Sequence, residues 1–312
     1  MPAHSLQMSF FKKTPLQASE EEKTLALGCP TLDALLALSP GGSLLLEENE
    51  EKGFSAALMS VFVASQIHSG NKCLVIHAAL RKQPALPLPT QSTQKTQNTE
   101  MEIAWRYQSL KQETEGGLSF DLKKKWHRRE GESACYKTVS TDSLGPDGVF
   151  KTLADFKKQA LENTKTLHTI VLDGLGDMSW HSTDPEEIAV LFWKATALAR
   201  ETKNVFVLAL SPLYLWKQKT QRKGNPSVAE TLLPETLPLI ADSHISFVRF
   251  EEGGVEADGM LFVHKVNTKN SFVAQHCPLS GEKLFFKCRQ FFTAQKAYFL
   301  PETPETEDPL AF

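Results

Sequence analysis

Residues 43–55 read SLLLEENEEKGFS and carry the strongest indication of the fold class. The apolar run over 43–46 predicts a short buried strand, and an acidic loop follows it over 47–53. From Phe54 to Ser69 the apolar residues recur at helical spacing, which predicts a helix that packs on one face. A strand, a loop and a helix in this order stand where a nucleotide-binding domain carries its phosphate-binding loop.

The loop departs from a working phosphate-binding loop. The pattern G-x-x-x-x-G-K-[ST] needs glycines that turn backbone N–H groups inward and a lysine that meets the phosphates. Here Lys52 precedes Gly53, Ser55 follows, and the upstream glycine is absent. Four glutamates within 47–51 would repel a triphosphate, since a pair of like charges about 4 Å apart costs on the order of 1–4 kcal/mol. We interpret the loop as degenerate: either a scaffold without its catalyst or an acidic surface that meets a basic neighbour across a subunit contact.

Further apolar runs predict more strands of the same sheet, at 72–78, 168–173 and 204–211. A helix is predicted to start at Asp184-Pro185-Glu186-Glu187, which has a cap residue, a proline and acids in the first turn, and to end near Thr202. Alternation of strand and helix is typical of an α/β fold with a mostly parallel central sheet.

The last third of the chain has a different pattern. Residues 244–251 and 259–266 alternate between apolar and polar and flank a Gly-Gly turn, which predicts antiparallel strands. The aromatic-rich segment 285–299 is expected to extend this pairing.

Ligands of parallel sheets bind at the carboxyl ends of the strands. We therefore expect the loop 47–53, Asp173 and the segment after Ser211 to lie along one edge. Asp173 ends an apolar run, as the metal-organising acid of nucleotide-hydrolysing enzymes does. Asp-Gly after a strand is also an ordinary turn, and no neighbouring glutamate supplies a water-activating base. The nucleotide-binding candidates are thus Lys52, Gly53, Ser55 and Asp173.

Two basic clusters are candidates for phosphate contacts. The first carries Lys217, Lys219, Arg222 and Lys223, has no acid among them, and is flanked by Tyr214 and Trp216. We predict a loop there that contacts nucleic acid, with a solvated surface loop as the alternative. The second cluster, KKKWHRR over 123–129, is denser but is diluted by neighbouring acids.

Composition narrows the class of protein. The 312 residues are enough for one large domain, and a net charge of −3 leaves nucleic-acid binding to local patches. Five cysteines without a C-x-x-C pair argue against a disulfide framework and a zinc ribbon. The scattered histidines predict no metal site, no catalytic signature is present, and no apolar stretch predicts a signal peptide or a membrane span.

The domain prediction has four parts. Residues 1–22 are expected to be a flexible arm, 23–300 one domain, and 301–312 an acidic disordered tail. Within the domain, 81–100 is rich in Pro, Gln, Thr and Ser, which predicts a flexible insertion.

Several segments together resemble one family. They are GCPTLDALLALSPGGSLLLEE, AWRYQ (104–108), FDLKKKW (120–126), GMLFVHKV (259–266) and FFKCRQFFTAQKAYFLPE (285–302). From about Leu25 to Glu302 the chain resembles Elongator complex subunit 4, the PAXNEB-like family. AWRYQ and the closing segment are its most specific parts, whereas G-x-P-x-L-D is general to RecA-like proteins. The turn SPGG is shorter than the family's usual one, and 81–100 has no obvious counterpart.

The resemblance implies a RecA-like ATPase fold with a degenerate phosphate loop. It implies a hetero-hexameric ring with Elongator subunits 5 and 6, which binds tRNA and supports the modification of wobble uridines at C5. The catalytic chemistry would lie in the subcomplex of subunits 1, 2 and 3, in the cytoplasm and nucleus. This chain would then be no enzyme and hold no cofactor of its own. Whether ATP binds at the interfaces of the ring is a question that the resemblance leaves open. In such rings the loop after 204–211 faces the central opening, which favours Lys217, Lys219, Arg222 and Lys223 as tRNA contacts. The alternative is an active ATPase subunit with a divergent loop, and a DNA-binding RecA relative is a third reading.

Overall fold

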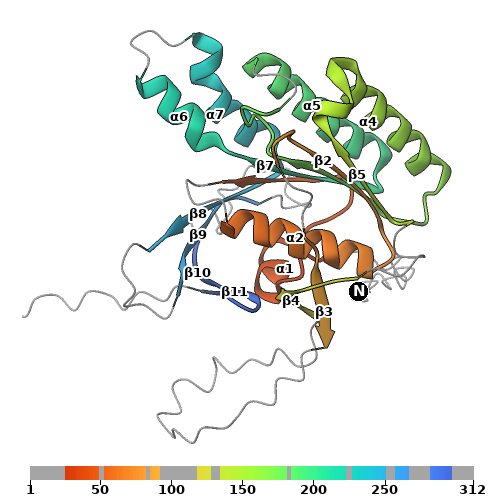
Figure 1. Cartoon of the computed structure of the whole chain (residues 1–312), viewed down its shortest axis with the longest axis vertical. Helices are drawn as coiled ribbons and strands as arrows, with labels where there is room; N and C mark the ends of the chain where they lie inside the picture. The colour runs from red at the N-terminus through yellow and green to blue at the C-terminus, as the bar shows by residue number, and fades with distance from the viewer. Residues whose placement is uncertain are drawn as a thin grey trace, which may run out of the picture.

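The computed structural model of the chain describes residues 25–48, 53–81, 85–91, 118–127, 134–180, 184–222, 227–250, 257–266 and 282–296. The strands in these residues are β1 (Ser43–Glu47), β2 (Lys72–His77), β3 (Pro87–Gln91), β4 (Leu118–Lys125), β5 (Tyr136–Ser140), β6 (His168–Asp173), β7 (Val205–Ser211), β8 (Ser243–Arg249), β9 (Gly259–Lys265), β10 (Glu282–Cys288) and β11 (Phe292–Lys296). The α-helices are α1 (Pro30–Leu36), α2 (Gly53–His68), α4 (Gly145–Glu162), α5 (Pro185–Thr202), α6 (Leu213–Arg222) and α7 (Val228–Ile240), and Thr141–Ser143 form a 3-10 turn (Figure 1).

Nine of these strands form one sheet in the order β11-β10-β9-β8-β1-β7-β6-β2-β5. The strands from β8 to β5 are parallel, whereas β9, β10 and β11 are added in antiparallel pairs. The predicted α/β class, with a mostly parallel sheet and antiparallel C-terminal strands, is therefore confirmed. The chain leaves β1 for β2 and later returns to β8 on the other side of β1, so the strand order reverses beside β1.

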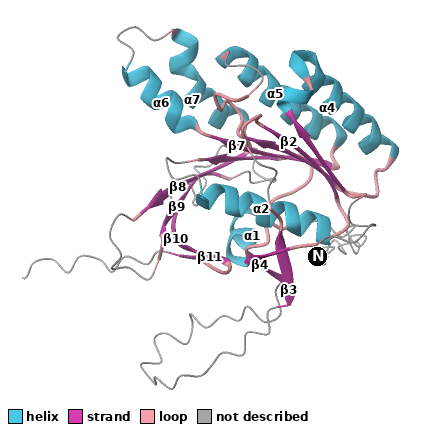
Figure 2. Cartoon of the chain, viewed as in Figure 1, coloured by secondary structure: helices cyan, strands magenta, loops and turns pink. Residues whose placement is uncertain are grey.

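Helices cover both faces of the parallel strands, which explains their unbroken apolar runs. Figure 2 shows α1 and α2 on one side of the sheet and α4, α5, α6 and α7 on the other. Successive residues of β1 point to opposite faces: Leu44 and Leu46 belong to the core under α1 and α2, and Leu45 to the core under α4 and α5. All three leucines are fully buried, and each contributes about 2 kcal/mol of apolar burial.

The helix start at Asp184 is confirmed in detail. Its carboxylate accepts a hydrogen bond from the Glu186 N–H at 3.2 Å, and Pro185 occupies the first turn. Such a cap contributes about 1 kcal/mol.

Two segments differ from the predictions. Part of the expected insertion 81–100 is ordered as β3, which pairs antiparallel with β4, because Leu86 and Pro87 have an apolar surface of α2 and β4 to cover. The short strand β5, whose YKTVS sequence alternates weakly, was not predicted and forms the sheet edge beside β2.

The predicted arm 1–22, the tail 301–312 and the motif AWRYQ lie outside the described residues. None of the four described cysteines, Cys29, Cys73, Cys135 and Cys288, forms a disulfide with another described residue.

Candidate functional site

The carboxyl ends of β1, β6 and β7 lie together, as predicted. The Glu48 N–H, just after β1, donates to the Ser211 carbonyl at the end of β7 at 2.9 Å. Asp173 ends β6, and its register partners are His77 on β2 and Leu210 on β7. This edge is where the fold would present a nucleotide site.

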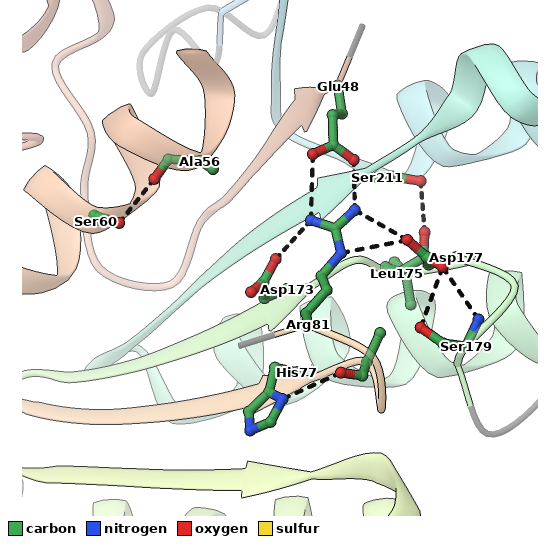
Figure 3. Close-up of polar contacts among 11 residues, drawn as sticks. Glu48, Ala56, Ser60, His77, Arg81, Asp173, Leu175, Asp177, Ser179 and Ser211 are labelled. Carbon is green, nitrogen blue, oxygen red and sulfur yellow. Dashed lines mark hydrogen bonds and ion pairs between the residues drawn. The ribbon is translucent and has the colours of Figure 1, made fainter. Parts of the chain in front are cut away.

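Arg81 fills the space between these strand ends (Figure 3). Its guanidinium forms ion pairs with Glu48 at 2.5 Å, Asp173 at 2.9 Å and Asp177 at 3.2 Å. The arginine side chain is 14% exposed, and the Glu48 side chain is fully buried. Sequence reasoning did not identify Arg81, which it placed in the expected insertion.

Local backbone geometry brings Arg81 into this position. After β2 the Ala78 N–H donates to the Asp173 carbonyl, and the Arg81 N–H closes a turn onto the Ala78 carbonyl. Gly174 has a φ of +80°, and a Cβ there would lie 2.4 Å from the arginine Nε. Asp177 is held in turn by the N–H and the hydroxyl of Ser179. A glycine is therefore required beside the guanidinium.

The charged groups of this cluster shift one another's pKa values. Burial raises the pKa of Asp173, and the adjacent guanidinium partly opposes that rise. Burial also works against the charged form of Arg81, but Glu48, Asp173 and Asp177 outweigh it and raise the arginine pKa. Arg81 therefore stays charged at any ordinary pH, and it supplies the cation that these three carboxylates need.

The described residues do not fit a triphosphate at this place. Its phosphates would enter beside Glu48, Asp173 and Asp177, and the Arg81 guanidinium is already engaged with all three. Repulsion at about 4 Å costs on the order of 4 kcal/mol per charge pair near a protein surface. The predicted degeneracy of the loop thus extends to the carboxylates behind it.

The other predicted nucleotide residues are only partly brought together. Gly53 begins α2, and Ser55 lies in its first turn. The Ser55 hydroxyl is buried and, among the described residues, has no hydrogen-bond partner. Lys52 lies outside the described residues.

A second polar cluster lies on the other side of Glu48. Glu47 pairs with Lys217 at 2.5 Å and with His244 at 3.3 Å. Burial alone would raise the pKa of Glu47, but its contacts with His244 and Lys217 bring it below the ordinary value. His244 stacks on His264, with ring centroids 4.6 Å apart. Burial and the neighbouring His244 lower the pKa of His264.

The first basic cluster is a helix and not the predicted loop. Lys217 and Lys219 lie on α6, which Arg222 ends, because Leu213 and Trp216 at helical spacing reach the core. Trp216 is buried and donates to the Gly176 carbonyl at 2.9 Å, so it is no surface for a base. Lys223 lies outside the described residues.

The second basic cluster is partly a strand. Lys123, Lys124 and Lys125 are exposed at the end of β4, and Lys124 approaches Asp121 at 3.6 Å.

Among the residues that the structure describes, no three His, Cys, Asp or Glu side chains are grouped as metal ligands. None of the described helices is long and apolar enough to cross a membrane.

Comparisons with known proteins agree with this fold. A family model described as PAXNEB protein matches residues 17–308. The chain resembles a solved structure described as the ATPase domain of G40P with a TM-score of 0.51 and 11% sequence identity, over 90% of this chain and 94% of that chain. This likeness shows a RecA-like ATPase fold. No curated protein matches the chain.

Proposed function

The chain belongs to the PAXNEB family, the family of Elongator subunit 4, and we propose that it acts there as a non-catalytic RecA-like subunit. In this proposal it assembles with Elongator subunits 5 and 6 into a hetero-hexameric ring. The ring binds tRNA and supports C5 modification of wobble uridines by the subcomplex of subunits 1, 2 and 3. The complex acts in the cytoplasm and nucleus.

The single observation that carries the non-catalytic role is the Arg81 ion cluster. A nucleotide-hydrolysing site leaves its strand-end carboxylate available to organise a metal ion beside the phosphates. Here Asp173 is engaged by an internal guanidinium at 2.9 Å instead. Hydrolysis at this site would require Arg81 to leave three carboxylates at once, which is costly for buried ion pairs. ATP bound at ring interfaces would then rely on groups from other subunits.

One observation favours the alternative, an active ATPase with a divergent loop. The buried Ser55 hydroxyl, at the place where a phosphate loop would carry its metal ligand, has no partner among the described residues. Loss of this hydroxyl should therefore separate the two functions with little structural cost.

The test reconstitutes the ring from the full chain and subunits 5 and 6 and measures its mass, tRNA binding and ATP turnover. We expect a hetero-hexamer that binds tRNA and whose turnover is unchanged by Ser55→Ala. The matched control is Ser60→Ala, because the Ser60 hydroxyl on the same helix donates to the Ala56 carbonyl. A turnover that falls at least tenfold with Ser55→Ala alone, in an intact ring, would establish the ATPase function. Failure of the three subunits to form a ring would refute the proposed role in assembly.

A further inference from the structure

The antiparallel end of the sheet has one face that the described helices do not cover. On the inner face of β8–β11, side chains such as Phe247, Leu261 and Phe286 are buried under α1 and α2. The alternate side chains point outward and form what we call the open face: Val248, Met260, Phe262, His264, Lys283 and Phe285. In Figure 1, β8–β11 project away from α4, α5, α6 and α7.

The strand register brings the members of the open face together. Met260 lies between Val248 on β8 and Phe285 on β10, and Phe262 lies opposite Lys283. Directly opposed side chains of neighbouring strands are about 5 Å apart. The open face is therefore one continuous surface.

The surface combines aromatic rings with positive charge. The Lys283 ammonium lies 5.7 Å from the centroid of the Phe262 ring. The His264 ring is nearly parallel to Phe262, with centroids 6.3 Å apart and planes inclined by 19°. No described outward position of β8–β11 carries an Asp or a Glu. The face thus offers flat rings and the Lys283 ammonium to a ligand, with no carboxylate among its own side chains.

Its exposure is unusual for apolar side chains. Val248 is 50% exposed, and Phe262 and Phe285 are half-buried, although all three belong to one sheet face. The face also connects to α6: His264 stacks on His244, which pairs with Glu47, the partner of Lys217. A ligand on the open face would therefore lie beside the basic helix that follows β7.

We propose that the open face binds single-stranded RNA, with Phe262 and Phe285 stacking on unpaired bases and Lys283 contacting a phosphate. Proteins bind unpaired RNA by this combination of aromatic stacking and positive charge, often on a sheet. Duplex RNA buries the faces of its bases, so an unpaired loop of a folded RNA is the part that fits. The inference rests on the proposed engagement of tRNA and assigns it a surface.

The test measures the fluorescence anisotropy of a labelled oligouridylate of about ten nucleotides with the full chain. Phe262→Leu and Phe285→Leu keep an apolar side chain but remove the ring, so we expect each to raise Kd about tenfold. Lys283→Ala should flatten the log–log salt dependence by about 0.7. Trp193→Leu, which removes a 56% exposed ring from α5, is the matched control and should change neither. Thermal unfolding of each variant confirms that it is folded.

Unchanged affinity in both leucine variants, or no binding by the original chain, would overturn the inference. So would leucine variants that prevent ring formation while they bind the RNA normally, because the face would then be a protein interface. The ring assay separates this proposal from the proposed function. A ring that binds tRNA equally well with and without the leucine substitutions refutes only the open face. A chain that binds the oligouridylate through the face, but forms no ring, refutes only the assembly role.

Discussion

Replacing Arg81 by alanine should destabilise the fold by about 3–5 kcal/mol at pH 7, the usual cost of removing one partner from a buried ion pair. Glu48, Asp173 and Asp177 would lose their shared cation, and their side chains are only 0%, 5% and 13% exposed. Each lost contact of about 3 Å is worth roughly 5 kcal/mol at an effective dielectric constant of about 20. In the variant the three carboxylates can take up protons, and water can screen their mutual repulsion. The net loss of stability is therefore expected to be about 3–5 kcal/mol and not the sum of the three contacts.

The loss should depend on pH in a defined direction. Without the guanidinium the carboxylate pKa values rise above those of the unfolded chain. A raised carboxyl pKa contributes stability below the unfolded value, and that contribution is lost as pH rises through the folded value. The difference between the original chain and Arg81→Ala should therefore be largest at pH 7 and shrink toward pH 4.

Urea unfolding at several pH values measures this effect. Arg289→Ala is the control, because the Arg289 side chain is 73% exposed and its 3.9 Å pair with Asp258, itself 25% exposed, is worth less than about 1 kcal/mol. Millimolar Ca²⁺ should stabilise Arg81→Ala, in which the three carboxylates can accept a cation, but not the original chain. A loss below about 1 kcal/mol at pH 7, or one that grows on acidification, would show that Arg81 does not compensate the charge of the three carboxylates.

Three further predictions concern other sites. Burial raises the pKa of Asp33 to about 6, so ionisation of this carboxyl group lowers the free energy of unfolding by up to about 3 kcal/mol as pH rises from 4 to 7. Asp33→Asn should therefore flatten this part of the stability profile measured by urea unfolding, and an unchanged profile would contradict the assignment. Gly174→Ala should lower the free energy of unfolding by about 2–4 kcal/mol in the same assay, because the φ of Gly174 is +80° and the new Cβ would meet the Arg81 guanidinium. Gly53→Ala is the control: nothing lies within 4 Å of the new Cβ, so stability should change by less than about 1 kcal/mol, and equal losses in the two variants would rule out the packing argument. Lys217→Ala should cost less than about 1 kcal/mol of stability, because the Lys217 side chain is 50% exposed in its pair with Glu47. The same substitution should weaken tRNA binding by the ring and flatten the dependence of that affinity on salt, and an unchanged salt dependence would exclude Lys217 from the tRNA contacts.

Much of the fold could be predicted because the central strands are local apolar runs. Hydrophobicity and length were enough to predict the strands at 168–173 and 204–211, and the residues at the start of the helix 185–202 predicted its first turn. β3 and β5 could not be predicted in this way. Their short sequences, PLPTQ and YKTVS, contain no long apolar run, and they form strands because neighbouring elements offer hydrogen bonds and, for β3, an apolar surface.

The candidate site shows the same division. Asp173 was identified because its position at the end of an apolar run is a local signal. Arg81 was missed because its partners are 33, 92 and 96 residues away, and no local pattern marks a lone arginine after a strand. Lys217 and Lys219 were identified by their charge, but their helix was not, since its two core contacts, Leu213 and Trp216, were taken for the border of a loop.

In the proposed function the Arg81 guanidinium occupies the carboxylates that would otherwise organise a nucleotide's metal ion, and the chain is expected to bind no nucleotide by itself. The decisive measurement is a calorimetric titration of the isolated full chain with Mg-ATP. We expect no saturable heat up to millimolar nucleotide, in the original chain and in Ser55→Ala alike. Stoichiometric binding with a micromolar Kd that is lost in Ser55→Ala would show instead that the chain holds a nucleotide of its own.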